Sequence, residues 1–275
     1  AGDGADVRVR FWCWHAEGYN NAFRFDAARA RRDPRNPGRT SFGLGYNIAK
    51  SLLSLRPRAA VPPSFESAEG AGLDDSGNGG LMRTAPVALA ALHDRELVAD
   101  LAGDVTALTH AHVNSVAACV LWSEAIRRAV VEADPSELFD FAGCIRDGLD
   151  LVDGEYRERW SILVEEAVEG PPTIFNPNGW VVTAFQAALS AIVHTPVPED
   201  EPSRHLVDAL VAAVRVGHDT DTVAAIAGGL LGARWGASAV PDQWRSVLHG
   251  RRRSGEPIVE AVDLNALTRR SLSGY

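Results

Sequence analysis

The sequence has few cysteines, a shortage of positive charge and no long apolar run, and each shortage excludes a class of protein. Its three cysteines, Cys13, Cys119 and Cys144, are far apart and match no metal-ligand spacing, so we expect neither a disulfide framework nor a cysteine-held zinc site. Lys and Arg number 27 against 36 Asp and Glu, a net charge of −9, which predicts no sequence-independent nucleic-acid binding. No apolar run approaches the roughly 18 residues that cross a bilayer, and no signal peptide is recognisable. These features predict a cytoplasmic protein without a membrane segment.

Alternation of apolar and polar residues, the pattern of a half-buried strand, is also scarce. Instead, apolar residues recur every three or four positions in three stretches, at 113–121, 181–192 and 206–214. Each stretch predicts an amphipathic helix, and the many alanines allow close helix packing. The hydrophobic content of 46% over 275 residues is enough for a large core, and no linker or repeat divides the chain. We therefore predict an all-α fold, with residues 1–275 forming a single compact domain.

An acidic loop at 217–222 leads directly into an apolar helix that is expected to begin near Val223. The oxygens of Asp219, Asp221 and Thr222 can converge on one point in such a loop, and hard cations such as Mg²⁺ prefer oxygen ligands. Asp and Thr are also ordinary N-caps of helices. One cap needs only one such side chain, however, so three oxygen-bearing groups together favour a metal site.

A glycine-rich segment at 77–83 precedes a second apolar helix, which is expected to begin near Thr84. Three glycines in four residues leave backbone N–H groups accessible, and the helix start adds a dipole that favours a phosphate. Asn78 is placed to hold a ribose hydroxyl. Gly-Asn-Gly is also a common turn, and taken alone the segment is more typical of a turn than of a site.

Two histidines, His110 and His112, open the next predicted helix. With no cysteine or third histidine nearby, a polar contact or simple capping is favoured over zinc binding. His110 is also a candidate to stack on, or hydrogen-bond to, the ring of a ligand.

Four segments together, in this order, resemble the ADP-ribosylglycohydrolase family, the all-helical enzymes that remove ADP-ribose from modified targets. They are residues 77–86, 108–112, 178–182 and 217–222. The last is close to the family's Gly-Gly-Asp-Thr-Asp-Thr, with His218 in place of a glycine. The resemblance extends from about Phe11 to Gly236 and implies a multi-helix domain with orthogonal packing.

The resemblance also implies roles for individual residues. It implies metal ligands at Asp219, Asp221 and Thr222, and substrate contacts at Gly77, Asn78, Gly79 and His110. The family uses two Mg²⁺ ions, sometimes Mn²⁺, to hold ribose hydroxyls and activate water. The implied partner is an ADP-ribosylated protein or a small ADP-ribosyl compound, and the implied reaction is hydrolysis of its glycosidic bond.

The family's first motif, a Thr-Asp-Asp-Thr run near the N-terminus, has no counterpart here. The only Asp-Asp pair is Asp74–Asp75, which lies in a different loop. We therefore assign no general base, and we expect the first helices of the family to be missing from this chain. Two alternatives to an active hydrolase follow. One is an impaired relative that binds ADP-ribose or a nucleotide without cleaving it, and the other is a structural protein, as in some crystallins, which the acidic loop disfavours.

Overall fold

The fold is described from a computed structural model, in which residues 76–132, 138–250 and 257–272 are placed. The sequence features at Phe11 and at Asp74–Asp75 lie outside these residues. Within them, none of the helices is long and apolar enough to span a membrane.

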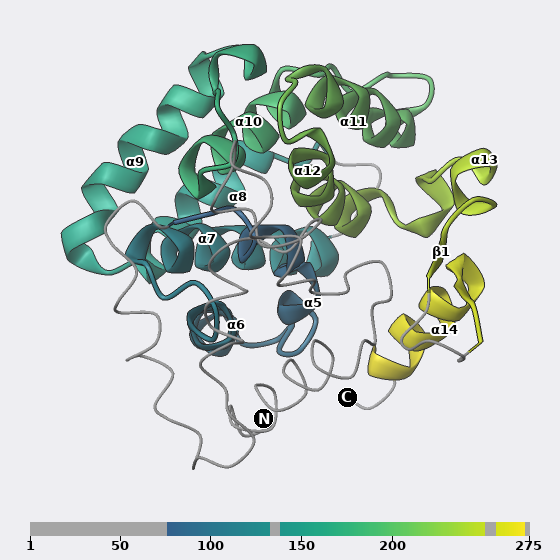
Figure 1. The fold of residues 1–275 in the computed structure, drawn as a ribbon, viewed down its shortest axis with the longest axis horizontal. Coiled ribbons are helices and arrows are strands. Elements are labelled where there is room, and N and C mark those ends of the chain that lie inside the picture. The colour runs from purple at the N-terminus through teal and green to yellow at the C-terminus, as the bar shows by residue number, and fades with distance from the viewer. Residues whose placement is uncertain (1–75, 133–137, 251–256, 273–275) are drawn as a thin grey trace, which may run out of the picture.

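Helices make up almost all of the described structure, so the all-α prediction is confirmed (Figure 1). The one sheet in the described ranges consists of two short antiparallel strands that pair His249 with Glu260. The elements, in chain order, are η2 (Leu81–Arg83), α5 (Ala85–Ala88), α6 (Arg95–Ala107), α7 (Val113–Val131), α8 (Phe141–Asp147), η3 (Gly148–Leu151), α9 (Gly154–Glu169), η4 (Pro172–Ile174), α10 (Val181–Val193), η5 (Pro202–Arg204), α11 (His205–Arg215), α12 (Thr220–Trp235), η6 (Ala237–Ala239), α13 (Asp242–Arg245), β1 (His249–Gly250), β2 (Val259–Glu260) and α14 (Ala261–Leu272).

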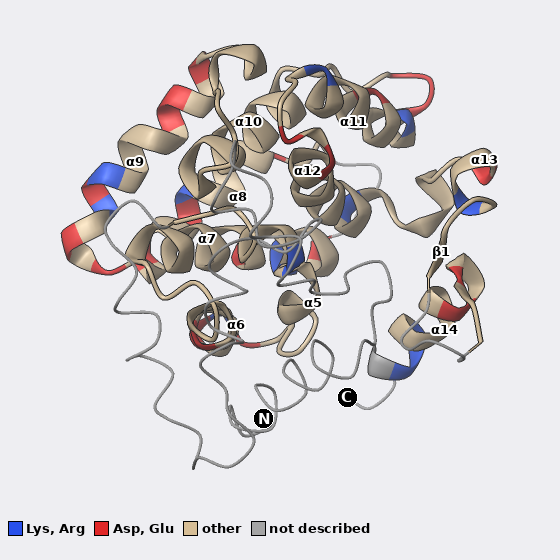
Figure 2. Cartoon of the chain, in the orientation of Figure 1, with Lys and Arg blue, Asp and Glu red and all other residues tan. Residues whose placement is uncertain are grey.

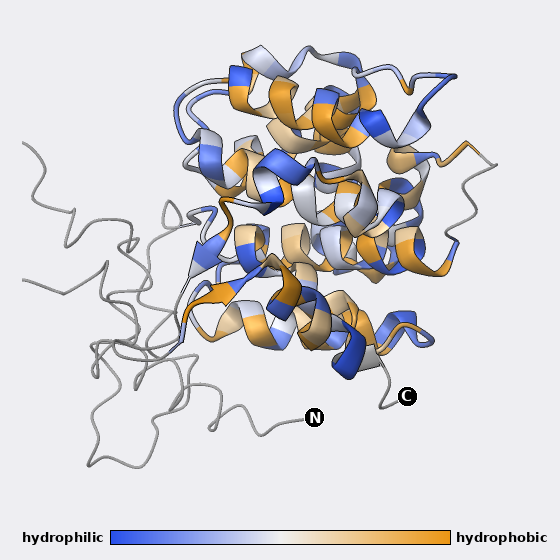
Figure 3. Ribbon diagram, turned by 90° about the vertical axis from the view of Figure 1, so that its right-hand side faces the viewer, coloured by the Kyte–Doolittle hydropathy of each residue, from blue (hydrophilic) through white to orange (hydrophobic). Residues whose placement is uncertain are grey.

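The core lies around α7 and α10, which are buried along nearly their whole length. Helices α6, α10 and α12 all pack against α7 (Figure 1). The ring of Phe185 on α10 makes edge-on contacts with Trp122 and Trp160, which are themselves fully buried. Edge-to-face packing of this kind adds about 1 kcal/mol per pair to the free energy gained by burial. The outer helices are amphipathic, with hydrophilic and hydrophobic stretches alternating along them (Figure 3).

A small residue allows α12 to approach α5 closely. A Cβ added at Gly229 on α12 would lie 2.9 Å from the Cβ of Ala85 on α5. Any side chain at position 229 would therefore push these helices apart. This contact matters for the site, because α12 begins at the acidic loop and α5 follows the glycine-rich segment.

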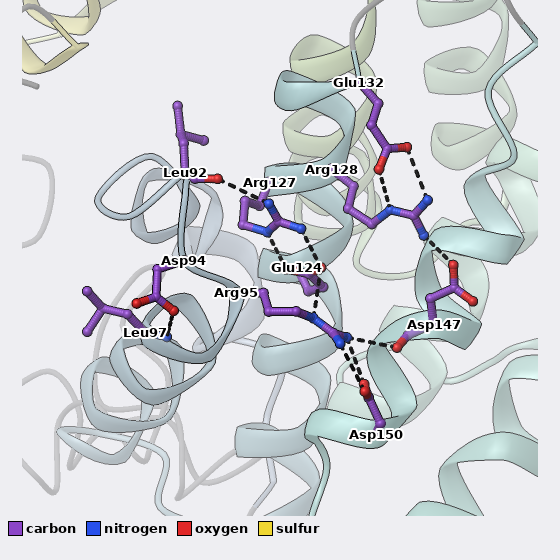
Figure 4. Close-up of polar contacts among 10 residues, drawn as sticks. All are labelled: Leu92, Asp94, Arg95, Leu97, Glu124, Arg127, Arg128, Glu132, Asp147 and Asp150. Carbon is purple, nitrogen blue, oxygen red and sulfur yellow. Dashed lines mark hydrogen bonds and ion pairs between the residues drawn. The ribbon is translucent and has the colours of Figure 1, made fainter.

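A network of charged side chains joins α6, α7 and η3 on one side of the core (Figure 4). Glu124 on α7 is 1% exposed, and both its oxygens accept hydrogen bonds from Arg127, at 2.6 and 2.8 Å. Arg95 on α6 lies 3.6 Å from Glu124 and also binds Asp150 through two nitrogens. Because these groups satisfy each other, the buried carboxylate is stabilised. Other acidic side chains lie along α9, at the surface (Figure 2).

Candidate functional site

The glycine-rich segment is held against the start of α10 by backbone hydrogen bonds. Gly77 and Trp180 form an isolated antiparallel bridge. In this bridge the Asn78 N–H donates to the Gly179 carbonyl at 3.1 Å, and the Val181 N–H donates to the Ser76 carbonyl at 2.9 Å. The segment is therefore part of the packed structure and not a free surface turn.

Asn178 connects this bridge to the acidic loop. Its side-chain oxygen accepts the backbone N–H of Asp219 at 2.9 Å, and its side-chain nitrogen donates to the Gly217 carbonyl at 3.0 Å. Its own carbonyl accepts a hydrogen bond from the side chain of Asn78 at 2.8 Å. Gly217 and His218 both have positive φ, 86° and 59°, so the chain turns sharply just before Asp219.

Asp219 precedes the first residue of α12, but its carboxylate does not cap the helix. Instead, Oδ2 of Asp219 accepts a hydrogen bond of 2.6 Å from the side chain of Asn78. The explanation of Asp219 as a simple N-cap is therefore wrong. Two segments that are 141 positions apart in the sequence meet through this contact, which joins a predicted substrate residue to a predicted metal ligand.

The other two predicted ligands lie in the first turn of α12. Asp221 is exposed, and the hydroxyl of Thr222 is buried and directed at the sulfur of Met82, 3.7 Å away. A thioether is a weak acceptor, so this hydroxyl remains a usable oxygen ligand. One Asp219 oxygen, the Asp221 carboxylate and the Thr222 hydroxyl are oxygen groups of the kind that a hard divalent cation prefers. Among the described residues, no group of three or more His, Cys, Asp or Glu side chains is arranged to hold a metal.

His110 lies behind the glycine-rich segment, where its ring packs against Gly80. A Cβ added at Gly80 would meet the Cβ and Cγ of His110 at 3.5 and 3.6 Å. The Nδ1 atom of His110 is 2.8 Å from the hydroxyl oxygen of Thr109. Burial, with a smaller effect of the Arg83 charge, lowers the pKa of His110 to about 3, so the ring is neutral at ordinary pH.

His112 acts as a helix cap, and Cys119 is a buried thiol. The Nδ1 of His112 accepts the backbone N–H of Asn114 at 3.1 Å and so caps α7, which confirms the predicted capping. Burial raises the pKa of the Cys119 thiol to about 11. A thiol that stays protonated is a poor nucleophile, so Cys119 is not a candidate for covalent catalysis.

A cavity of about 750 Å³ lies beside the glycine-rich segment. It is lined by Ser76, Gly77, His112, Val113, Asn114, Tyr156, Arg159, Gly179 and Trp180. The indole nitrogen of Trp180 donates to the Ser76 hydroxyl at 2.6 Å, which fixes one wall. Asn114 is 3% exposed, and its side-chain oxygen has no hydrogen-bond partner within the described ranges. A buried acceptor of this kind is costly to leave unmatched and is suited to a donor on a ligand.

The structure thus brings Asn78 and Asp219 into contact, with Gly77 and the half-buried Gly79 on either side of Asn78. His110 lies close behind, whereas Asp221 is directed to the surface and has no contact with the glycine-rich segment among the hydrogen bonds of the described residues. Sequence reasoning assigned no role to Asn178, Trp180 or Asn114. Asn178 and Trp180 lie in the segment at 178–182, one of the four that carry the family resemblance, whereas Asn114 had no signal in the sequence.

Comparison with known proteins agrees with this arrangement. The profile of the ADP-ribosylglycohydrolase family matches residues 2–272. The chain therefore belongs to the ADP-ribosylglycohydrolase family.

Individual relatives are moderately similar. ADP-ribosylhydrolase ARH3 of Homo sapiens is 28% identical over 247 residues, which cover 80% of this chain and 66% of ARH3. ADP-ribosylarginine hydrolase Tri1 of Pseudomonas putida (strain GB-1) is 30% identical over 173 residues, 62% of this chain and 41% of Tri1. The chain spans just under two thirds of the length of the human and mouse ARH3 proteins, 66% and 65%.

Among solved structures, the fold is similar to a chain titled ADP-ribosylglycohydrolase-related protein complex. The TM-score is 0.59 and the identity 22%, over 98% of this chain and 80% of that one. At this identity the similarity concerns the fold.

Proposed function

We propose that this chain hydrolyses the glycosidic bond between ADP-ribose and a modified protein or small-molecule acceptor, with Mg²⁺ or Mn²⁺ as cofactor. One observation carries the proposal beyond family membership. The Asp219 carboxylate, at the start of α12, is held by Asn78 of the glycine-rich segment and not by the helix that it precedes. A carboxylate fixed beside the half-buried Gly77 and Gly79 is suited to bind a sugar diol through a cation.

In this proposal ADP-ribose lies along Gly77, Asn78 and Gly79. The reacting ribose is placed beside Asp219, and the adenine end is placed in the neighbouring cavity. Trp180 and Tyr156 offer aromatic surface for a base there, and Arg159 offers positive charge for a phosphate. The unmatched side-chain oxygen of Asn114 is suited to accept a hydrogen bond from an amino group of the base.

The cation would be held by Asp219, Asp221 and Thr222. When bound, Mg²⁺ supplies a Lewis acid that polarises ribose oxygens and lowers the pKa of water. The protein's own part is positioning and charge. Asn78 and Asn178 fix the Asp219 carboxylate, and its negative charge offsets the positive charge that develops on the sugar as the glycosidic bond breaks. We assign no general base.

A cytoplasmic location is part of the same proposal. In the described part of the chain, Cys119 and Cys144 are both buried free thiols, and this state fits a reducing compartment.

The test is release of ADP-ribose from mono-ADP-ribosylated protein and from small ADP-ribosyl compounds, with Mg²⁺ or with EDTA. We expect Asp219→Asn, which removes the charge but keeps the shape, to lower the rate roughly 100-fold. Asp94→Asn is the matched control, because Asp94 is a true cap of α6 that accepts the Leu97 N–H at 3.0 Å, and Asn caps equally well. Release that is insensitive to EDTA and to Asp219→Asn would refute the proposed mechanism.

A second candidate is a protein that binds ADP-ribose without cleaving it. The observation in its favour is that, among the described residues, the acidic loop offers only two carboxylates, Asp219 and Asp221. Calorimetry separates the two functions. Tight binding of ADP-ribose that is unaffected by EDTA, with no turnover of any ADP-ribosyl substrate, favours the binding protein.

A further inference from the structure

The glycine-rich segment contacts the acidic loop at a second place, through the sulfur of Met82. Asn78 binds Asp219, and one turn later Met82 lies in η2, where its N–H donates to the Asn78 carbonyl at 3.2 Å. The Thr222 hydroxyl donates to the Sδ atom of Met82 at 3.7 Å, across 140 positions of the sequence. This one segment therefore contacts two of the three predicted cation ligands.

Among the described residues, Met82 carries the sulfur that an oxidant reaches most easily. It is the only methionine in the chain, and 37% of its surface is exposed. Cys119 and Cys144 are buried, and burial raises the pKa of their thiols to about 11 and about 12, so both stay protonated and slow to react. A thioether needs no deprotonation, so its exposure decides its reactivity.

Oxidation changes the chemistry of the contact with Thr222. Hydrogen peroxide transfers one oxygen atom to the Met82 sulfur, so the thioether is oxidised by two electrons to a sulfoxide and the peroxide is reduced to water. A thioether accepts hydrogen bonds weakly, whereas the oxygen of a sulfoxide is strongly polar. Because the methionine side chain is flexible, this oxygen can turn toward the hydroxyl that already faces the sulfur.

A stronger acceptor beside Thr222 favours binding of a cation there. A hydroxyl that holds a cation through a lone pair keeps its proton, and the cation makes that proton more acidic. An outer partner that accepts this proton in a hydrogen bond raises the basicity of the ligand oxygen. The hydrogen bond and the cation therefore stabilise each other.

We propose that Met82 is a modification site for peroxides, and that its sulfoxide strengthens cation binding by accepting a hydrogen bond from Thr222. The effect on the cation rests on the proposed function, which counts Thr222 among the ligands. Asp219 keeps its own partner, Asn78, so oxidation acts on one ligand of the set. Sulfoxide reductases restore the thioether, so the change is reversible.

The modification is tested by peptide mass spectrometry of the full chain after titration with hydrogen peroxide in EDTA. We expect one added oxygen at Met82 at peroxide doses that leave Cys119 and Cys144 as thiols. Methionine sulfoxide reductases, applied together so that both epimers are reduced, should remove this oxygen. Oxidation of either buried cysteine before Met82 overturns the assignment of the site.

Calorimetry with ADP-ribose on oxidised and untreated samples tests the consequence. The oxidised protein should bind roughly 5-fold more tightly in Mg²⁺ and equally in EDTA. Thr222→Ser keeps the hydroxyl and should keep the gain, whereas Thr222→Val and Met82→Leu should show none. Met82→Leu also controls for oxidation of Cys13, which lies outside the described residues. Unchanged or weaker binding in Mg²⁺ after full oxidation, or a gain in either of the last two variants, overturns the inference.

Urea unfolding in EDTA gives a readout that requires neither the cation nor the nucleotide. If the sulfoxide accepts a hydrogen bond from Thr222, oxidation should raise the equilibrium constant of unfolding roughly 5-fold more in Thr222→Val than in Thr222→Ser. Equal changes in the two variants overturn the hydrogen bond. Absence of ADP-ribose binding by the unsubstituted protein contradicts the proposed function instead, and the comparison in urea then still decides whether the sulfoxide binds Thr222.

Discussion

At the scale of single residues, Asn178 makes the site possible by using both ends of its side-chain amide and its backbone carbonyl. It has no exposed surface, and its partners Asn78 and Asp219 lie 100 and 41 positions away. A buried amide with satisfied donors and acceptors fixes the distance between the loops it joins. The Asp219 carboxylate is therefore held in place before any ligand arrives, which lowers the cost of binding.

His110 gives a prediction for the pH dependence of stability. Its folded pKa is about 3, against an ordinary value of 6.5, because burial and Arg83 disfavour the charged ring. Between these values the unfolded chain binds a proton that the folded chain does not. The free energy of unfolding must therefore fall as the pH drops from 6.5 toward 3, and His110 accounts for about 2 kcal/mol of this loss at pH 5.

The measurement is urea unfolding of the unsubstituted protein and of His110→Gln at pH 7.5 and pH 5. The variant should lose about 2 kcal/mol less between the two pH values, whatever its stability at pH 7.5. The comparison cancels the contribution of His205, whose pKa is also lowered by burial. Equal losses in the two proteins would mean that His110 is accessible to protons in the folded state.

The acidic residues of the site were easier to predict than the amides. Asp219 and Asp221 stand two apart before an apolar helix, so the spacing itself indicates convergent oxygens. Asn114 and Asn178 act through contacts with distant segments or through the lack of a partner, and such properties exist only in the folded chain. The sequence holds no signal for Asn114, and its one signal for Asn178 is the place of that residue in the segment at 178–182.

At the scale of elements, the helices that could be predicted are those with a wide apolar face. The stretches at 181–192 and 206–214 became α10 and α11, within one or two residues at each end. Helix α9 was not predicted, because only Trp160, Val164 and Ala167 of its sixteen residues are buried. A helix begins near Thr84, as predicted, but it is short. Residues 85–88 form only one turn as α5, and a new helix, α6, begins after the cap at Asp94.

The contact between α12 and α5 yields a prediction with a matched control on the same helix. In Gly229→Ala the new Cβ would lie 2.9 Å from Ala85, and such overpacking costs roughly 1–3 kcal/mol, which outweighs the helix-propensity gain of up to about 1 kcal/mol. A Cβ at Gly232 meets nothing within 4 Å, so Gly232→Ala keeps the gain alone. Unfolding in urea should show a stability difference of about 2 kcal/mol between the two variants.

The same pair of variants tests whether this contact matters for the site. Helix α12 packs on η2 and α5, so a displaced α12 moves Asp219 relative to Asn78. Hydrolysis of ADP-ribosylated protein should slow in Gly229→Ala and stay unchanged in Gly232→Ala. If Gly229→Ala is as stable and active as the unsubstituted protein, the helices separate without cost, and the close approach has no role in setting the site.

At the scale of the whole molecule, the site depends on the complete fold. Its parts come from residues 76–80, 110–114, 178–180 and 219–222, which are brought together by the packing of α7, α10 and α12. A ligand that touches several of these segments binds the folded chain and has no comparable site on the unfolded one. Binding must therefore raise the stability of the entire molecule.

Thermal unfolding with ADP-ribose, in Mg²⁺ or in EDTA, measures this stabilisation as a rise in Tm. At a ligand concentration 100 times the Kd, the stabilisation is about 2.7 kcal/mol, which for a chain of this size corresponds to a rise in Tm of roughly 5–10 °C. If Asp219 holds a cation that contacts the sugar, the cation and the nucleotide stabilise each other's binding, so the rise should be larger in Mg²⁺ than in EDTA. Asp219→Asn should keep the EDTA-resistant part of the rise and lose the part that depends on Mg²⁺. An equal rise in Tm in Mg²⁺ and in EDTA would contradict the proposed cation but would support binding of the nucleotide. If Tm does not rise under any condition, both the cation and the nucleotide site are contradicted, because a ligand that joins these segments cannot bind without stabilising them.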